Sequence, residues 1–171
     1  MKLVPFGRTD LAVSNLCLDV SNLARIADKR AAYDILDTFC AHGGNFMQAG
    51  ADVNATDRAR SDSLLGQWMT DRDIMRNELV LTTKIIVPAD DSFTRESLRR
   101  VVREACEDAL RNLQVDHIDV LLCEIRPVVF SLETLLAALS PLIADGKARH
   151  FGVSRFPAHR LHAARWLPNG Q

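Results

Sequence analysis

Two charged residues stand in otherwise apolar surroundings, where they could perform acid–base chemistry. Lys84 follows the largely apolar stretch LVLTT, and Glu124 comes after six largely apolar residues. Burying a charged group is costly unless it is paired or neutralised. A buried lysine amine can act as a base or form a Schiff base, and a buried carboxyl can act as a general acid or base. A salt bridge from Glu124 to Lys84 or to Arg126 is the competing interpretation.

Polar side chains also follow the other segments that we expect to be strands. Asp19 and Asp52 are further candidate catalytic carboxylates, although aspartates are common in exposed loops as well. The candidate substrate-binding residues are Gln48, Asn54, Arg126, Ser154 and Arg155. The two arginines could hold a carboxylate or phosphate of a substrate, or they could lie solvated in loops.

Alternating strands and helices must position these residues. A hairpin is expected within residues 1–14, followed by strands at 15–20, 45–50, 78–87, 117–125 and 148–156. Apolar residues at helical spacing predict helices within 28–44 and 92–114. Start and stop signals predict further helices within 56–71 (capped by Thr56 or Asp57), 131–147 (ending at Gly146) and 157–167 (starting at Pro157). Strict alternation favours parallel strands with right-handed crossovers. The pattern predicts an α/β fold of about five β-α units, either an open doubly wound sheet or part of a (β/α)8 barrel.

Composition excludes several classes of protein. A length of 171 residues fits one domain spanning residues 1–171, and a net charge of −1 argues against nucleic acid or anionic membrane as a partner. The N-terminus lacks the apolar core of a signal peptide, and no apolar run is long enough to span a bilayer. The four scattered cysteines form no CxxC pair, so we expect no metal site, no redox dithiol and a cytoplasmic location.

Five stretches, in the same order and spacing, resemble the aldo-keto reductase family. They are FGRTDLAVSNLCL, GGNFMQAG, LVLTTKI, LRNLQVDHIDVLL and LIADGKARHFGVSRF, and they run from residue 6 to about 165. The resemblance implies a (β/α)8 barrel, here a partial one because a full barrel needs about 250 residues. It also implies NADPH-dependent carbonyl reduction by an aspartate, a tyrosine, a lysine and a histidine.

The positions that correspond to these four residues are mostly substituted. In the order aspartate, tyrosine, lysine and histidine they hold Gln48, Val53 (or Asn54 if the loop shifts by one), Lys84 and Glu124. The chain has a single tyrosine, Tyr33, within the first expected helix. Valine cannot donate a hydrogen bond to an oxyanion. We therefore expect that the reductase chemistry has been lost.

The cofactor contacts implied by the resemblance are also reduced. Ser154 keeps the serine of the family's Ser-Asn pair, but Arg155 replaces the asparagine. The contacts to the adenosine phosphate belong to later strands and loops, beyond residue 171. We therefore expect no cofactor, with NADP possible but disfavoured.

These observations lead to one expected function and two alternatives. We expect a non-redox acid–base enzyme, an isomerase, dehydratase or cyclase that acts on a small carbonyl compound through Lys84 and Glu124. One alternative is a non-catalytic binding or assembly module that has kept the scaffold. The second alternative is a diverged or truncated NADPH-dependent oxidoreductase.

The sheet edges suggest a partner. Five β-α units leave strand edges and apolar faces uncovered, and an exposed edge invites pairing with another chain. We therefore expect a homodimer that covers the open edge of the barrel.

Overall fold

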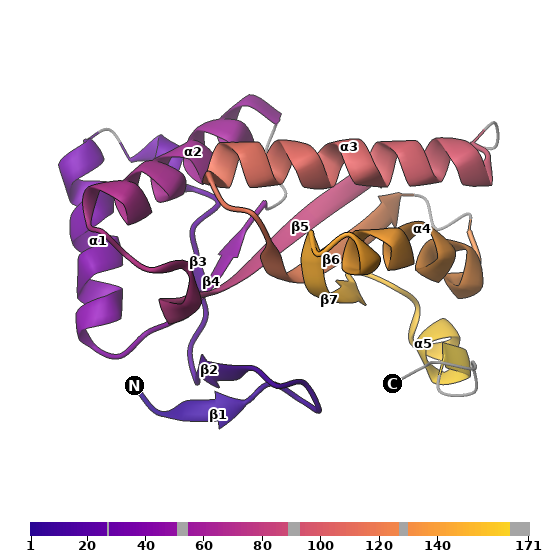
Figure 1. The fold of residues 1–171 in the computed structure, drawn as a ribbon, viewed down its shortest axis with the longest axis horizontal. Coiled ribbons are helices and arrows are strands. Elements are labelled where there is room, and N and C mark those ends of the chain that lie inside the picture. The colour runs from indigo at the N-terminus through magenta and orange to yellow at the C-terminus, as the bar shows by residue number, and fades with distance from the viewer. Residues whose placement is uncertain (27, 51–54, 89–92, 127–129, 165–171) are drawn as a thin grey trace.

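The computed structural model describes residues 1–26, 28–50, 55–88, 93–126 and 130–164. The chain begins with an antiparallel hairpin of β1 (Leu3–Pro5) and β2 (Ala12–Ser14). Five parallel strands then form one sheet in the order β3-β4-β5-β6-β7 (Figure 1). Their bounds are β3 Leu18–Asp19, β4 Phe46–Ala49, β5 Val80–Pro88, β6 Ile118–Arg126 and β7 Ala148–Val153. The predicted hairpin and parallel strands are confirmed.

A helix follows each parallel strand. The helices are α1 Lys29–Ala41, α2 Ala55–Asp71, α3 Arg95–Leu113, α4 Leu132–Ala144 and α5 Ala158–Ala164. Two short 3-10 helices, η1 (Leu23–Arg25) and η2 (Arg76–Glu78), were not predicted from the sequence. The start of α3 is capped by Thr94, whose side chain accepts a hydrogen bond from the backbone N–H of Ser97 at 3.1 Å.

The two faces of the sheet are covered by different elements. Alternate residues of β5, such as Ile85 and Val87, pack with α3 and α4 in one apolar cluster. Met47 and Leu81 pack with α1 and α2 in a second cluster on the same face. The hairpin instead packs Leu11 against the opposite face. Since helices α1 to α4 all cover one face, the arrangement is that of a barrel wall rather than of a doubly wound sheet.

The opposite face will be called the inner face. On β5 it carries Val80, Thr82, Lys84 and Ile86, the residues that alternate with those facing the helices. The hairpin covers the amino ends of the strands on this side, where Phe6 meets Phe46 edge to face with ring centroids 5.4 Å apart. The carboxyl ends of the strands are therefore the end of the inner face where a site can form.

A search for membrane spans over the described ranges finds no helix that is both long and apolar enough to cross a bilayer.

Candidate active site

The strand register brings the predicted residues to neighbouring positions on the inner face. Lys84 on β5 pairs with Leu122 on β6, and Glu124 pairs with Ile86. Ser154 follows β7, and its backbone N–H donates to the carbonyl oxygen of Cys123. Lys84 in the middle of β5, Glu124 near the carboxyl end of β6 and Ser154 just after β7 therefore come from three consecutive strands.

Glu124 is the centre of this group, which we call the Glu124 cluster: Lys84, Glu124, Arg126, Ser154 and Arg155. The Glu124 side chain is only 1% exposed, and Lys84 Nζ lies 3.8 Å from its Oε2. Ser154 Oγ donates to the same oxygen at 3.2 Å. Arg126 Nε donates to Oε1, and Arg155 Nε lies 3.5 Å from Oε1. The salt bridges considered from the sequence are present, and both carboxylate oxygens are engaged.

Opposing effects act on the pKa of Glu124, and the balance lowers it. Burial raises the pKa because it disfavours the charged form. The hydrogen bonds from Arg126 and Ser154, with the positive charges of Arg126 and Lys84, lower it by more. Glu124 is therefore an ionised carboxylate at neutral pH. In this state it can anchor a cation but has no proton to donate.

Arg155 reaches Glu124 from an unusual backbone conformation. Its φ is +52°, in the left-handed region. That conformation costs an L-residue about 1 to 2 kcal/mol, so surrounding structure must hold it there. Contact with a buried carboxylate is one interaction that offsets this cost.

Two other predicted residues lie on the same inner face but outside the Glu124 cluster. Asp19 pairs with Gln48 in the β3–β4 register, and Gln48 pairs with Thr82. Asp19 is exposed, and its Oδ1 accepts a hydrogen bond from the backbone N–H of Ser21 at 2.9 Å. This hydrogen bond within a local turn gives the Asp19 side chain a structural role. Asp52, Val53 and Asn54 lie outside the described residues.

Tyr33 has a packing role in α1, away from the strand ends, as predicted. Its side chain is buried among the α1 and α2 residues. Its hydroxyl donates to Asp71 Oδ2 at 2.8 Å, at the end of α2. Since this is the only tyrosine of the chain, the Glu124 cluster contains no phenol.

Sequence reasoning missed Asp62, a buried aspartate of α2. Its Oδ1 accepts a hydrogen bond from the backbone N–H of Gly50, just after β4, at 3.3 Å. Within the described parts of the chain its Oδ2 is buried without a hydrogen-bond partner, and burial raises the pKa of Asp62 to about 6. The spacing from Asp62 to Leu65 and Met69 places it on the buried stripe of α2, and that pattern could have identified it.

A second missed aspartate, Asp119, lies at the amino end of β6, remote from the cluster. Arg76 Nη2 and Arg149 Nη1 donate to it at 2.6 and 2.9 Å. The backbone N–H of Leu81 donates to its Oδ2 at 2.9 Å. Arg149 also donates to Asp10 of the hairpin at 2.6 Å, so this network joins the hairpin to the sheet. In the sequence, Asp119 stands as a charged residue inside the otherwise apolar β6 segment, and this could have indicated that it has buried partners.

Comparison with known proteins identifies what the chain is similar to. The model of the aldo/keto reductase family matches residues 20–169. A Saccharomyces cerevisiae protein provisionally named aryl-alcohol dehydrogenase AAD3 is 31% identical over 154 residues. Norsolorinic acid reductase of Aspergillus flavus is 29% identical over 161 residues. Each match covers 85% of this chain but only 41% and 40% of the respective relative, so the chain spans about two fifths of these proteins.

A solved structure agrees on the fold. The aldo/keto reductase from Klebsiella pneumoniae, solved in complex with NADP and acetate, superposes with a TM-score of 0.73 at 23% identity. The superposition covers 93% of this chain and 52% of that chain. The predicted partial (β/α)8 barrel with an N-terminal hairpin is confirmed.

Two expectations from the sequence are wrong in light of these findings. The first was that reductase chemistry had been lost in favour of a non-redox isomerase, dehydratase or cyclase. The matched family and relatives are reductases and dehydrogenases, and none of them supports such a loss. The second was that no cofactor is involved, which conflicts with the NADP in the Klebsiella structure. The first rested on substituted positions and on the lack of a second tyrosine, and the second also on contacts expected beyond residue 171. This reasoning weighs less than a match over residues 20–169.

Proposed function

This chain belongs to the aldo/keto reductase family, and we propose that it contributes the Glu124 cluster to an NADP(H)-dependent oxidoreductase. The proposed reaction interconverts an aryl aldehyde or ketone and the corresponding alcohol. The aryl substrate class is suggested by the name of the aryl-alcohol dehydrogenase relative. The observation that carries the proposal is the buried ion pair between Lys84 and Glu124 on two neighbouring strands of the barrel wall.

The residues of the cluster are suited to a dinucleotide. Arg126 and Arg155 bring cationic side chains to the carboxyl ends of β6 and β7, where anionic groups are favoured. The Ser154 hydroxyl lies among them and can donate a hydrogen bond to an amide or phosphate oxygen. These are the residues that would hold the cofactor. When bound, NADPH supplies the hydride that reduces the carbonyl carbon.

Lys84 is the proposed proton donor. As a carbonyl is reduced, negative charge develops on its oxygen, and a positioned donor is needed there. The Lys84 side chain is only 12% exposed, which limits competition from water. Its ammonium can give a proton from Nζ to the carbonyl oxygen.

Glu124 acts as a positioning residue in this proposal. Because its pKa is lowered, it stays ionised and fixes Lys84 Nζ from the side of β6. Arg126 and Arg155 hold the other carboxylate oxygen, so the carboxylate cannot easily turn away from Lys84. We propose a cytosolic location for the same protein, because all four cysteines are free thiols and a reducing compartment suits them.

The test measures NADPH binding by calorimetry and NADPH oxidation with benzaldehyde, using the 171-residue protein. Lys84→Met should lower turnover by about 10² or more, the usual contribution of a general acid, with little change in the Kd for NADPH. Lys147→Met is the matched control, because Lys147 is also paired with a glutamate but lies on the helix side of the molecule. Absence of NADPH binding, or equal turnover of the Lys84→Met and wild-type proteins, would refute the proposal.

A further inference from the structure

Asp62 of α2 is a buried carboxyl group that lies against the end of β4. The residue is 1% exposed, and its Oδ1 accepts a hydrogen bond from the backbone N–H of Gly50 at 3.3 Å. Burial raises the pKa of Asp62 to about 6, although the Gly50 hydrogen bond and the charge of Arg58 act in the opposite direction. Ionisation of Asp62 therefore lowers the stability of the fold at neutral pH. Stability alone gives no reason for a carboxyl group at this position.

Gly50 connects Asp62 to the backbone of Lys84. It directly follows β4, and a Cβ atom built on it would lie 2.5 Å from the carbonyl oxygen of Lys84 and 3.0 Å from Cγ2 of Thr83. The Gly50 backbone therefore touches two consecutive residues in the middle of β5. Atoms packed this closely do not move independently of one another. A shift of Gly50 therefore shifts the backbone of Lys84.

α2 is held in place on both sides of Asp62. The hydroxyl of Ser61 donates to the backbone carbonyl oxygen of Ser21, just after β3, at 2.8 Å. One turn after Asp62, Gly66 lies against the end of α3, where a Cβ atom would come within 2.6 Å of the Leu113 carbonyl oxygen. The helix is therefore a fixed support from which Asp62 can hold Gly50.

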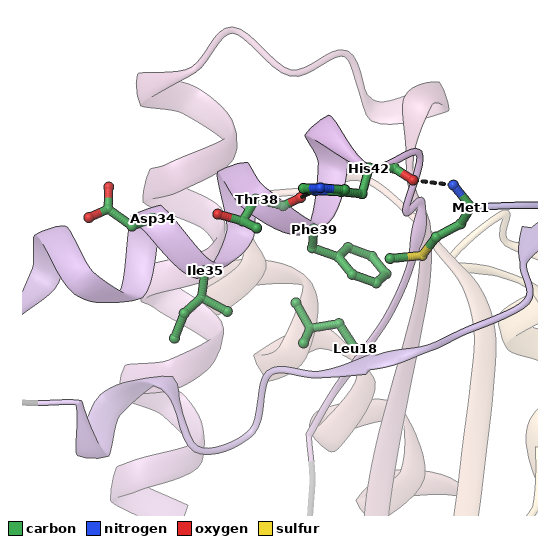
Figure 2. A pocket seen from close by; sticks show the side chains of 7 residues that line it. All are labelled: Met1, Leu18, Asp34, Ile35, Thr38, Phe39 and His42. Atoms are coloured by element: carbon green, nitrogen blue, oxygen red, sulfur yellow. Dashed lines mark hydrogen bonds between the residues drawn. The ribbon is translucent and has the colours of Figure 1, made fainter.

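The hollow beside α1 gives Gly50 no space to move into. Its volume is about 490 Å³, and Figure 2 shows the side chains around it, among them Leu18 and Phe39. Gly50, Asp62 and Lys84 are not among the residues that line it. A displacement of Gly50 is therefore passed on to β5 rather than absorbed in this hollow.

We propose that Asp62 is a positioning residue for Lys84, and that it acts through its hydrogen bond to Gly50. This inference rests on the proposed reductase function, in which Lys84 gives the proton. Lys84 Nζ lies 3.8 Å from Glu124 Oε2, so a shift of the β5 backbone changes both this ion pair and the reach of the amine toward a carbonyl oxygen. A misplacement of about 1 Å can lower turnover by about 10². Asp62 itself takes no part in the proton transfer.

The property that this role requires of Asp62 is a hydrogen-bond acceptor rather than a negative charge. Asparagine has the same shape and keeps a side-chain oxygen for the Gly50 N–H. Leucine fills a similar space but has no acceptor, so the Gly50 N–H is left buried without a partner. The Gly50 backbone then gains by moving to find another acceptor. The two substitutions therefore separate the hydrogen bond from the charge.

The experiment measures kcat and KM for benzaldehyde with NADPH in the 171-residue protein. Asp62→Leu should lower kcat roughly tenfold or more with little change in KM, and Asp62→Asn should stay within about twofold of wild type. Ser61→Ala is the comparison, because this fully buried neighbour loses its hydrogen bonds to Ser21 and Ala24 but does not bond to Gly50. It should lower the stability of the protein and leave kcat unchanged.

A second readout does not depend on catalysis. The chain has four lysines, and the methyl carbon NMR resonance of the reductively methylated Lys84 amine is identified by its absence in the Lys84→Met variant. Asp62→Leu should shift this resonance, whereas Asp62→Asn and Ser61→Ala should leave it in place. If the wild-type protein reduces no aldehyde, the proposed function fails, and the Lys84 resonance still decides whether Asp62 positions this amine.

Three results would overturn the proposal. The first is an Asp62→Leu protein with the wild-type Lys84 resonance and wild-type kcat. The second is an Asp62→Asn protein as impaired as Asp62→Leu, because the charge and not the hydrogen bond would then matter. The third is an equal loss of kcat in Ser61→Ala, which would reduce the effect to general stability. If circular dichroism shows that Asp62→Leu does not fold, Asp62→Ala removes the same acceptor with a smaller side chain.

Discussion

Gly50 lies directly against the backbone of Lys84. A Cβ atom at Gly50 would come within 2.5 Å of the Lys84 carbonyl oxygen and 3.0 Å of its nitrogen. Gly50 also has a φ of +65°, in the left-handed region. The residue after β4 must therefore be glycine for Lys84 to occupy its position, so the site depends on a residue that carries no functional group.

Gly50→Ala should destabilise the protein by roughly 2 to 5 kcal/mol, because left-handed backbone strain adds to a clash with a strand. Gly146→Ala is the matched control, since Gly146 has a φ of +70° but nothing within 4 Å of its Cβ position. That variant should lose only about 1 kcal/mol. Urea denaturation gives both free energies of unfolding, and equal losses would contradict the steric role of Gly50.

Asp62→Asn should stabilise the protein above pH 6. The pKa of Asp62 is raised to about 6 by burial, so the folded state binds this proton more tightly than the unfolded state does. Wild-type stability therefore falls as pH rises from about 4 to 6, by up to about 3 kcal/mol. Asparagine removes the charge and can still accept from the Gly50 N–H. Urea denaturation should show a higher free energy of unfolding for the variant than for wild type at pH 7.5, and no difference at pH 4. An equal gain in stability at both pH values would exclude the ionisation of Asp62 as its source.

Glu124→Gln should destabilise the protein by roughly 3 to 5 kcal/mol at neutral pH, because it leaves Lys84 beside an uncharged partner in a buried position. The pKa of Glu124 is lowered in the folded state, so its stabilisation is present above the unfolded pKa and is lost as pH falls through the folded pKa. The difference in the free energy of unfolding between variant and wild type should therefore become smaller at acidic pH.

The control for Glu124 is Glu107→Gln, which removes a more exposed glutamate paired with Lys147 and Arg103. Its cost should be much smaller than that of Glu124→Gln, because ion pairs near the surface contribute little to stability. Thermal unfolding at several pH values compares the two variants. A Glu124→Gln protein as stable as the Glu107→Gln protein would show that the buried pair is not stabilising.

Asp119→Ala should cost roughly 3 to 5 kcal/mol, because two arginines and the Leu81 N–H lose a buried acceptor. The neighbouring Asp116→Ala should change stability by less than about 1 kcal/mol, since the Asp116 side chain is 87% exposed. Amide hydrogen exchange should also show faster exchange in the hairpin of the Asp119 variant, because the link through Arg149 to Asp10 is loosened. Unchanged hairpin protection would argue against that link.

Local patterns predicted the order of elements correctly. The period of the apolar residues identified α1 and α3, because one face of each must be buried, and start and stop residues identified α2, α4 and α5. The hydrogen bond of the Thr94 cap and the left-handed conformation of Gly146 after α4 are features of the local chain, which spans only a few residues. The order of the family-like stretches predicted a barrel, and it was more reliable than the substitutions at Gln48 and Glu124 taken singly.

The sequence by itself therefore determined the strands, the helices and the residues at the strand ends, because these follow from short-range periodicity and turn chemistry. Only the tertiary structure decided that the helices cover one face, that Glu124 meets Lys84, Ser154 and Arg155 from neighbouring strands, and that Asp62 is buried against Gly50. Those relationships depend on strand register and crossover packing between residues that lie 12 to 40 positions apart. A pattern that repeats every two or four residues contains no information about such pairings.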